Sequence, residues 1–505
     1  MQKLKLRNYQ QADVDYLSQQ KQIAIFNEMR TGKTPTSLKI YEKWCQQENK
    51  EMSLLIICPA TLQNHWQVSV EQWLEKPSVI LTNLTFSQRQ NVYRKFSYGK
   101  PIIAIISKDT FKGDSFFFKV WRTGQPTFPF VIIIDEAHFL RNWTSQQSEA
   151  VYTLNDNKYK MVLTGTPLVN HGADIFGILK FLKPELFPNY WDFCERYFYI
   201  HHYWKKIENR YGKEFSFLIR KALGYRGKKE KEELNGIINT FSVSHTQKEV
   251  MTWLPKVEFR EIKLQMEKEQ AQVYNRWLDS WDKKNPLQLL TWMKTIILYP
   301  PALIKYKEVM MDDGTILVDP KLNERTDPLL ESEKKLLKNI TGAKILWVND
   351  FCLNQEKDLS ILIFSTRTAT FLEPLAFYLN TSFSYRGRND KVGLIVGSVS
   401  QKKRLETVND FQKGKIRVLL CNIISAGVGL NLSQADIVIF ADRAWSPADN
   451  QQAEDRFLPV DETNVKPKVV IDLVMEKTID EKVLKLLSKK QDITKLVIDN
   501  PDILL

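Results

Sequence analysis

Two short segments, about a hundred residues apart, constrain the fold of this chain more than any other feature. The first, NEMRTGKT (27–34), follows the apolar run IAIF and ends in Gly-Lys-Thr. The second, VIIIDEAH (131–138), places two carboxylates directly after four β-branched residues. A strand buried on both faces of a parallel sheet has such an apolar run, and open α/β folds bind ligands where their strands end. The pair therefore predicts a parallel sheet with a phosphate-binding loop and an acidic pair at one edge.

The Gly-Lys-Thr segment has the residue types that hold nucleotide phosphates. A tight turn before a helix directs several backbone N–H groups to one point, where the helix dipole adds positive potential. Gly32 leaves room for phosphate oxygens, Lys33 can reach the β- and γ-phosphates, and the Thr34 hydroxyl can bind Mg²⁺. The strict pattern has a glycine five residues before Gly32, where this chain has Asn27. Taken alone, the segment is a partial match, and an ordinary exposed loop is the alternative.

The acidic pair supplies the second half of a hydrolytic site. Asp135 would hold Mg²⁺ through water, and Glu136 would orient or deprotonate the attacking water. The alternative is an acidic pair solvated at a strand end. The presence of both motifs in this order favours a site that hydrolyses a nucleoside triphosphate.

Composition limits the partners and the compartment. A length of 505 residues suits two or three domains. The net charge of +13 favours a polyanionic partner. The five cysteines include no CxxC pair, which indicates a reducing compartment without disulfides or a zinc module. The chain has no apolar stretch long enough to span a membrane, and its first ten residues lack the apolar core of a signal peptide, so we expect a cytoplasmic protein.

The order of apolar runs predicts two α/β lobes with a different region between them. Strands alternating with helical stretches imply a parallel sheet covered by helices. Expected strands of the first lobe are 53–59, 101–107, 130–135 and 160–165. Expected strands of the second lobe are 359–365, 392–397, 416–422, 435–442 and 467–474. The predicted domains are a first lobe over 1–185, an aromatic, charged and mainly helical insertion over 186–335, and a second lobe over 336–505.

With these motifs placed, the chain resembles the Swi/Snf-like ATPases of helicase superfamily two, in a compact, bacterial or phage form, over nearly its whole length. NEMRTGKT is similar to that family's phosphate loop, which also lacks the leading glycine, and DEAH (135–138) to its metal-and-water motif. Further segments that resemble family motifs are LRNYQ (6–10), CPATLQNHW (58–66), SKDT (107–110), LTGTP (163–167), SAGVGLNL (425–432) and DRAWSPADNQQAEDR (442–456). The resemblance implies an α/β fold of two RecA-like lobes. Features of the insertion lie where the family has helical protrusions, namely 254–255, Tyr274 and 291–301.

The resemblance also implies roles for individual residues, with ATP and Mg²⁺ as cofactors. Expected ATP contacts are Arg7, Gln10, Met29, Arg30, Thr31, Gly32, Lys33, Thr34, Gly427 and Gly429, with Gln10 reading the adenine. Expected metal ligands are Thr34 and Asp135. Expected catalytic residues are Lys33, Asp135, Glu136 and Arg456, the last reaching across from the second lobe. Expected DNA contacts are Pro59, Thr61, Lys108, Asn431 and Trp445. Expected residues for coupling hydrolysis to lobe movement are Thr164, Gly165, Thr166 and Gln452.

Two departures from the family pattern put parts of this assignment in question. The family has two arginines three residues apart in its closing motif, whereas this chain has Arg456 and then Pro459. An arginine finger contributes roughly a thousandfold or more to hydrolysis, so Arg456 either carries the role alone or is helped by another residue. The segment SHTQKEV (244–250) replaces adjacent arginines, which removes a contact to DNA or between the lobes.

The resemblance implies a DNA-stimulated ATPase that translocates on or remodels duplex or branched DNA without sequence preference. Three alternatives stay open: a strand-separating DNA helicase, a nucleotide-gated DNA clamp of weak turnover, and a subunit of a larger DNA-processing complex. LRNYQ and the long insertion argue against a DEAD-box RNA helicase. Because the chain shows no added chromatin-reading module, we expect a stand-alone role in the cytoplasm of a bacterium or a phage-infected host.

Overall fold

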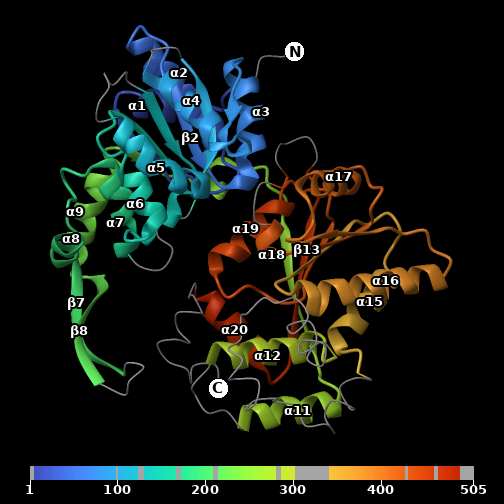
Figure 1. Ribbon diagram of the computed structural model, residues 1–505. Helices are drawn as coiled ribbons and strands as arrows, with labels where there is room; N and C mark the ends of the chain where they lie inside the picture. Colours follow the sequence, from blue (N-terminus) through green and yellow to red (C-terminus); the bar gives the residue numbers. More distant parts are fainter. Residues whose placement is uncertain are drawn as a thin grey trace. The chain divides into compact units, whose positions relative to one another are not determined.

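The computed structural model describes residues 5–97, 101–122, 130–165, 172–208, 214–279, 286–301, 340–426, 430–459 and 465–489. The chain forms two units, Met1–Thr252 and Trp253–Leu505, which we call the first and second lobes (Figure 1). Each lobe has its own parallel sheet, which confirms the predicted α/β fold with two parallel-sheet lobes. The domain boundaries expected near residues 185 and 335 stay a prediction.

The first lobe is built on a seven-stranded sheet of order β3-β4-β2-β5-β6-β1-β9, in which every neighbouring pair is parallel. Its strands are β1 (Gln22–Ile25), β2 (Ser53–Cys58), β3 (Val79–Ile80), β4 (Ile103–Ser107), β5 (Phe130–Ile134), β6 (Tyr159–Leu163) and β9 (Ser242–Val243). The central strands β2, β4, β5 and β6 are buried along their whole length. Their continuous apolar sequences follow from this burial, since helices cover both faces of such a sheet.

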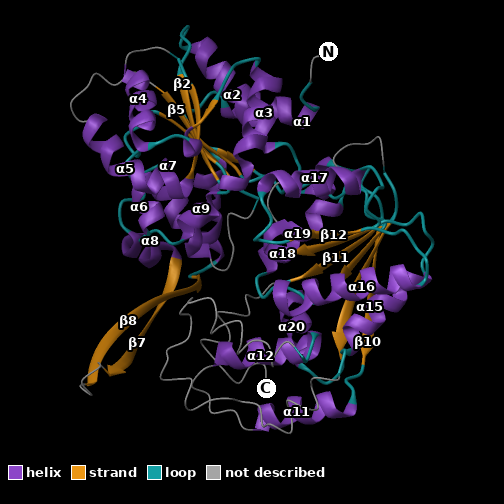
Figure 2. Ribbon diagram, turned by 45° about the vertical axis from the view of Figure 1, so that its right-hand side comes forward, coloured by secondary structure: helices purple, strands orange, loops and turns teal. Residues whose placement is uncertain are grey.

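Helices lie on both faces of this sheet (Figure 2). The longer ones are α1 (Asn8–Leu17), α2 (Lys33–Gln47), α3 (Gln63–Leu74), α4 (Phe86–Ser97), α5 (Lys108–Arg122), α8 (Tyr190–Tyr197) and α9 (Lys228–Asn239). Shorter turns of helix are η1 (Ala60–Leu62), η2 (Leu81–Asn83), η3 (Ala137–Arg141), α6 (Gln146–Tyr152), η4 (Gly172–Ile175), α7 (Phe176–Leu182) and α10 (Gln247–Val250).

The region expected to be mainly helical contains a long antiparallel ribbon. Strands β7 (Phe198–Glu208) and β8 (Glu214–Tyr225) pair with each other and extend away from α8 and α9 of the same lobe (Figures 1 and 2). The prediction of few strands here was therefore wrong for this segment. A ribbon with two largely exposed faces needs no alternation of apolar and polar residues, so the sequence has no period-two pattern to detect.

The second lobe has a six-stranded parallel sheet of order β10-β15-β14-β11-β13-β12. Its strands are β10 (Val257–Leu264), β11 (Ile361–Ser365), β12 (Val392–Ile395), β13 (Val418–Asn422), β14 (Ile437–Phe440) and β15 (Lys468–Met475). Alternate residues of β11 belong to two separate apolar clusters, Ile361 and Ile363 to one and Leu362 and Phe364 to the other. Both faces of this sheet are therefore packed. All nine strands expected from the sequence are present. The expected set did not include β10 in this lobe, nor β1, β3 and β9 in the first lobe.

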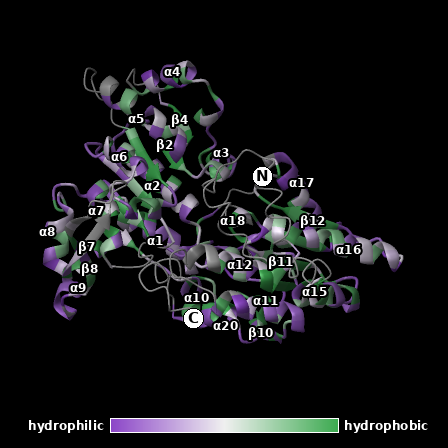
Figure 3. Cartoon of the chain, turned by 60° about the horizontal axis from the view of Figure 1, so that its bottom comes forward, coloured by the Kyte–Doolittle hydropathy of each residue, from purple (hydrophilic) through white to green (hydrophobic). Residues whose placement is uncertain are grey.

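Helices of the second lobe complete these two clusters and form a third one. They are α11 (Lys268–Asp279), α12 (Pro286–Leu298), α15 (Ala343–Asn354), the π-helical turn η6 (Thr368–Leu372), α16 (Glu373–Tyr385), α17 (Gln401–Gln412), α18 (Ile423–Ala426), α19 (Pro447–Phe457) and α20 (Ile479–Ser488). The helices of the third cluster are α11, α12 and α20. Hydrophobic residues concentrate in strands such as β2, β4 and β11, whereas the helices mix hydrophobic and hydrophilic positions (Figure 3). Over the described residues, none of the helices combines the length and apolarity needed to cross a bilayer.

Candidate active site

The Gly-Lys-Thr segment forms a loop between the end of β1 at Ile25 and the start of α2 at Lys33. Gly32 caps this helix in the left-handed conformation, with φ 79° and ψ 38°. A Cβ atom at this position would lie 2.1 Å from Nε2 of Gln10. Glycine is thus required here both by the backbone conformation and by a close neighbour.

The segment LRNYQ lies against this loop. The Thr31 carbonyl oxygen accepts hydrogen bonds from the Tyr9 hydroxyl at 2.5 Å and from Gln10 Nε2 at 3.1 Å. Gln10 is buried, and its Oε1 accepts from the Arg7 backbone N–H at 2.8 Å. Of the two residues expected to contact the nucleotide from this segment, Gln10 lies against the loop and Arg7 contacts Gln10. The reading of adenine by Gln10 stays a prediction.

Lys33 bends back over the loop that precedes it. Its Nζ donates to the carbonyl oxygens of Asn27 at 2.9 Å and Glu28 at 3.0 Å. The end of β6 lies against the same place, because a Cβ atom on Gly165 would be 3.3 Å from the Met29 amide nitrogen and 3.5 Å from Lys33 Nζ. The structure thus brings an expected coupling residue, Gly165, next to the expected phosphate-binding lysine.

Asp135 follows β5 and is held from two sides. Its Oδ2 accepts from Trp66 Nε1 at 2.8 Å, and its Oδ1 accepts from the Glu136 backbone N–H at 2.9 Å. Burial, followed by the neighbouring Glu136 carboxylate, raises the pKa of Asp135 to about 6. The Trp66 hydrogen bond and the charge of Lys33 lower this pKa.

Trp66 was missed by the sequence reasoning, which placed its segment only against DNA. The ring is fully buried on α3, and its indole N–H fixes one oxygen of the Asp135 carboxylate. A tryptophan N–H usually finds a partner when it is buried. The sequence does not reveal which partner, because 69 positions separate the two residues.

Glu136 has a strained backbone, with φ 50° and ψ 47°. A residue other than glycine in this region costs of order 1–3 kcal/mol, and such strain gathers at functional sites. One carboxylate oxygen of Glu136 lies 3.3 Å from Nδ1 of His138, two residues further on in η3. With this left-handed backbone conformation, Glu136 ends the extended path of β5.

Parallel strands place further predicted residues along this edge of the sheet. Because β4, β2, β5 and β6 are neighbours, their carboxyl ends form one row. The predicted residues at these ends are Lys108 after β4, Pro59 and Thr61 after β2, Asp135 and Glu136 after β5, and Thr164 and Gly165 after β6. Contact of Pro59, Thr61 and Lys108 with DNA stays a prediction.

The segment SHTQKEV frames the phosphate loop. Through β9 and the residues that follow, backbone N–H groups of Phe26 and Glu28 donate to the carbonyl oxygens of Val243 at 2.8 Å and His245 at 2.9 Å. Gln247 is buried, and its Nε2 donates to the Met29 carbonyl oxygen at 2.9 Å. The segment that departs from the family pattern thus contacts the loop directly, which sequence reasoning did not anticipate.

The same frame accounts for Asn27 at the place of the expected glycine. Asn27 is fully buried; its Oδ1 accepts from the His245 backbone N–H at 3.0 Å, and its Nδ2 donates to Asp13 at 3.3 Å. Nε2 of His245 lies 2.9 Å from the second oxygen of Asp13. Asparagine therefore connects α1 with the residues that directly follow β9, a role that glycine could not fill.

Most of the described predicted residues of the second lobe lie on or just before α19. Gln452 and Arg456 are on α19, and Trp445 precedes this helix. Asn431 is exposed, and its carbonyl oxygen accepts from Gln412 Nε2 at 2.6 Å. Three predicted residues, Thr166, Gly427 and Gly429, lie outside the described residues.

Asp442, the first residue of the closing motif, is buried and surrounded by donors. It accepts from the Ser365 hydroxyl at 2.5 Å and from the Thr366 backbone N–H at 3.0 Å. Nζ of Lys294 lies 3.2 Å from its other oxygen and also donates to the Arg443 carbonyl oxygen at 2.7 Å. Lys294 belongs to the stretch 291–301, so α12 is bound directly to the closing motif.

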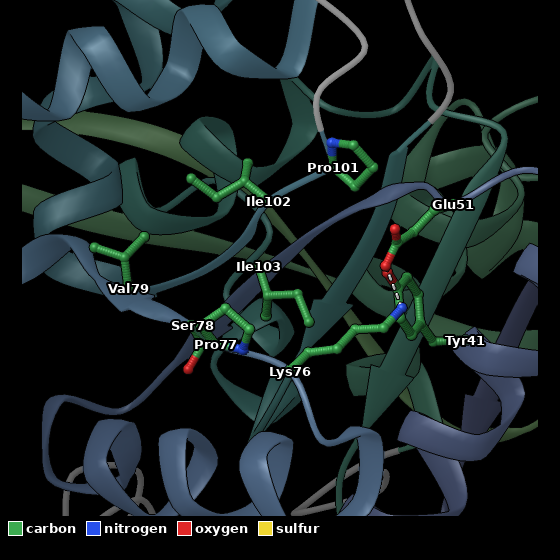
Figure 4. Close-up of a pocket in the computed structure, with 9 residues that line it drawn as sticks. All are labelled: Tyr41, Glu51, Lys76, Pro77, Ser78, Val79, Pro101, Ile102 and Ile103. Carbon is green, nitrogen blue, oxygen red and sulfur yellow. Dashed lines mark hydrogen bonds and ion pairs between the residues drawn. The ribbon is translucent and has the colours of Figure 1, made fainter.

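A hollow of about 290 Å³ lies at the opposite edge of the first sheet (Figure 4). It is lined by Tyr41, Glu51, Lys76, Pro77, Ser78, Val79, Pro101, Ile102 and Ile103, and Lys76 forms an ion pair with Glu51. Because its wall includes the first residues of β3 and β4, it is separated from the phosphate loop by the length of the strands.

The described residues thus form two parallel-sheet lobes, and the first has a Gly-Lys-Thr loop and an acidic pair at the carboxyl ends of its strands. The SNF2-related domain family matches residues 9–305, more than half of the chain, and the helicase conserved C-terminal domain matches residues 343–458. The chain belongs to the SNF2-related family.

Similar curated proteins cover nearly all of this chain. The DNA annealing helicase and endonuclease ZRANB3 of Homo sapiens is 24% identical over 86% of this chain and 35% of its own length. The uncharacterized ATP-dependent helicase MG018 of Mycoplasma genitalium is 23% identical over 97% of this chain and 42% of its own length. The chain spans half or less of the length of these relatives. A solved structure, the Sulfolobus solfataricus SWI2/SNF2 ATPase core in complex with dsDNA, is 22% identical, covers 99% of this chain and 94% of its own, and has a TM-score of 0.41.

Proposed function

We propose that this chain is a DNA-stimulated ATPase that moves along or remodels duplex or branched DNA. The observation that carries the proposal is the arrangement at one edge of the first sheet, where Lys33 donates to the Asn27 carbonyl oxygen in the Gly-Lys-Thr loop and buried Asp135 follows β5 of the same sheet. The relatives named as a DNA annealing helicase and an ATP-dependent helicase support the same activity.

ATP and Mg²⁺ are the proposed cofactors, and the residues present fit them. Asp135 is a buried carboxylate with a raised pKa, so its ionised form lacks compensation that a cation would supply. Within the described part of the chain, no three or more His, Cys, Asp or Glu residues are grouped to hold a metal. This suits Mg²⁺, which takes most of its ligands from phosphate and water. Thr34 and Asp135 would hold the ion, which supplies charge neutralisation on the phosphates when bound.

The proposed chemistry divides the remaining roles among the chain's own residues. Lys33 and the loop Met29–Gly32, with Arg7 and Gln10, bind the nucleotide, and Glu136 orients the attacking water. From the second lobe, Gly427 and Gly429 contact the nucleotide, and Arg456 stabilises charge that develops in the transition state. Thr164, Gly165, Thr166 and Gln452 would couple this step to movement of the lobes.

DNA binding rests in this proposal on phosphate contacts rather than base contacts. Pro59, Thr61 and Lys108 of the first lobe and Asn431 and Trp445 of the second are the proposed contacts. Such binding has no sequence preference and weakens steeply with salt. We also propose that the protein works in the cytoplasm of a bacterium or a phage-infected bacterial cell; its five cysteines, all free thiols, support a reducing compartment.

The test is steady-state ATP hydrolysis without nucleic acid and with single-stranded, duplex or branched DNA or RNA. Stimulation by DNA, lost in Lys33→Ala and in Glu136→Gln, is the expected result. Glu136→Gln should still bind ATP, whereas Lys33→Ala should not. ATP binding without turnover in all five conditions would instead favour the nucleotide-gated clamp or a motor that needs a missing subunit. Separation of strands in an unwinding assay would favour the helicase.

A further inference from the structure

The β7–β8 ribbon has a packed base and an exposed outer part. At the base, Phe198 is buried, its ring centroid lies 4.8 Å from that of Tyr225, and Gly172 of η4 packs against both rings. Further out, Trp204 is 68% exposed and Leu218 is 52% exposed. An isolated two-stranded ribbon is only marginally stable, so its packed base is what anchors it to the first lobe.

Aromatic rings are presented on both faces of the outer ribbon. The register pairs Trp204 with Leu218 and Tyr203 with Ile219. Directly paired residues share a face, and successive residues alternate between faces. Trp204 and Tyr203 therefore point to opposite sides. Exposed Tyr203, Trp204 and Leu218 thus gather on one ribbon, and large apolar side chains that gather on a surface mark an interaction site.

The charge of the ribbon indicates what kind of partner this is. β7 and β8 together carry four Lys or Arg residues and two Glu residues, and one of these cations, Arg220, already pairs with Glu195 of α8 at 3.6 Å. Two of the cations, Lys205 and Lys206, directly follow Trp204 in β7. Flat rings next to cations are the combination that binds single-stranded nucleic acid, since bases stack on the rings and the cations attract the phosphates.

Duplex DNA does not offer the same surface. Within a duplex the flat faces of the bases are covered by their neighbours, so an exposed ring gains stacking only where bases are unpaired. The ribbon would therefore contact bases, whereas Pro59, Thr61 and Lys108 are proposed to contact phosphates.

We propose that the outer part of the β7–β8 ribbon is an arm that stacks on unpaired bases, with Trp204 as its main contact. The chain would then prefer branched DNA with single-stranded arms to blunt duplex. This inference rests on the proposed function and specifies its substrate.

The experiment compares fluorescence anisotropy of a labelled fork with unpaired arms and of a blunt duplex of equal length, alongside ATP hydrolysis with each DNA. We expect Trp204→Ala to weaken fork binding about five- to a hundredfold, the range for loss of one stacked base, and to leave blunt-duplex binding and DNA-free hydrolysis unchanged. Trp204→Phe, which keeps a flat ring, should retain most of the fork affinity. Phe116→Ala is the matched control, because Phe116 is an aromatic residue of α5 in the same lobe and is 77% exposed.

Unchanged fork binding by Trp204→Ala, in a wild type that binds and is stimulated by DNA, would overturn the ribbon proposal alone. Equal weakening for fork and blunt duplex would overturn base stacking in favour of a general DNA contact. A wild type that neither binds nor responds to any DNA would overturn the proposed function as well. Thermal unfolding of each variant shows whether the lobe is intact, and Tyr203→Ala provides a second variant on the other face.

Discussion

At the scale of single residues, the structure gives two separate reasons for glycine at position 32, and the sequence motif contains neither of them. Its left-handed φ and the Gln10 amide 2.1 Å from an added Cβ both exclude a larger side chain. We predict that Gly32→Ala weakens ATP binding at least tenfold and costs about 1 kcal/mol or more of stability. Gly113→Ala on α5, where an added Cβ meets nothing within 4 Å, should instead stabilise by roughly 0.5–1 kcal/mol. Nucleotide titration and thermal unfolding of both variants test this; wild-type ATP affinity in Gly32→Ala would contradict it.

The raised pKa of Asp135 makes this residue's contribution to the free energy of unfolding fall as the pH rises. Its pKa is raised from 3.8 to about 6, so between these values the folded chain binds a proton here that the unfolded chain has released. The stabilisation from this proton, on the order of 2–3 kcal/mol, is fully present below about pH 4 and is lost as the pH rises to about 6. We predict that, without Mg²⁺, the stability of wild type relative to Asp135→Asn falls across this window and is flat above it. Denaturant unfolding at several pH values measures the difference. A difference that rises with pH would show that the carboxylate is stabilised in its ionised form.

At the scale of elements, β9, α10 and the residues between them form hydrogen bonds with the Gly-Lys-Thr loop and its preceding residues, and we call this segment, 242–250, the brace. Gln247 donates to the Met29 carbonyl oxygen, and its own backbone N–H donates to the Glu28 carboxylate at 2.7 Å. Leaving a buried carbonyl without its donor costs about 1–3 kcal/mol. We therefore predict that Gln247→Ala raises the KM for ATP about tenfold with a smaller change in kcat. Lys248→Ala, an exposed neighbour on the same helix, is the control. A fall in kcat at unchanged KM would mean that this residue acts on the chemical step instead.

The elements also show where sequence reasoning succeeds. Buried parallel strands need apolar residues on both faces, so runs such as SLLIIC and FVIII predicted β2 and β5 without knowledge of their partners. β10 was missed because its sequence, VEFREIKL, is mostly exposed and has no continuous apolar run, the signal by which the predicted strands were found. The brace escaped for another reason: Gln247 and Met29 are far apart in the chain, and no local pattern records a contact that the fold alone creates. For the same reason the acidic motif could be found, but not the tryptophan that holds it.

At the scale of the whole molecule, the proposed activity needs residues from both lobes. The first lobe contains the phosphate loop and the acidic pair, while the second lobe contributes α19 with Arg456. The family's second arginine is replaced by Pro459, which is buried at the end of this helix. The chain's own sequence therefore leaves Arg456 as the residue through which the second lobe would act on the reaction.

This division predicts a kinetic signature for Arg456→Ala. Because an arginine finger acts on charge that appears only in the transition state, its loss lowers kcat and leaves ground-state binding nearly intact. We expect DNA-stimulated kcat to fall roughly a thousandfold or more, with ATP affinity changed only a few-fold. Gln451→Ala, an exposed residue on the same helix, controls for disturbance of α19. Single-turnover hydrolysis and equilibrium ATP binding, each at saturating DNA, separate the two effects. A variant that loses affinity but keeps its kcat would show that Arg456 holds the nucleotide rather than its transition state, and another cation would then have to replace both family arginines.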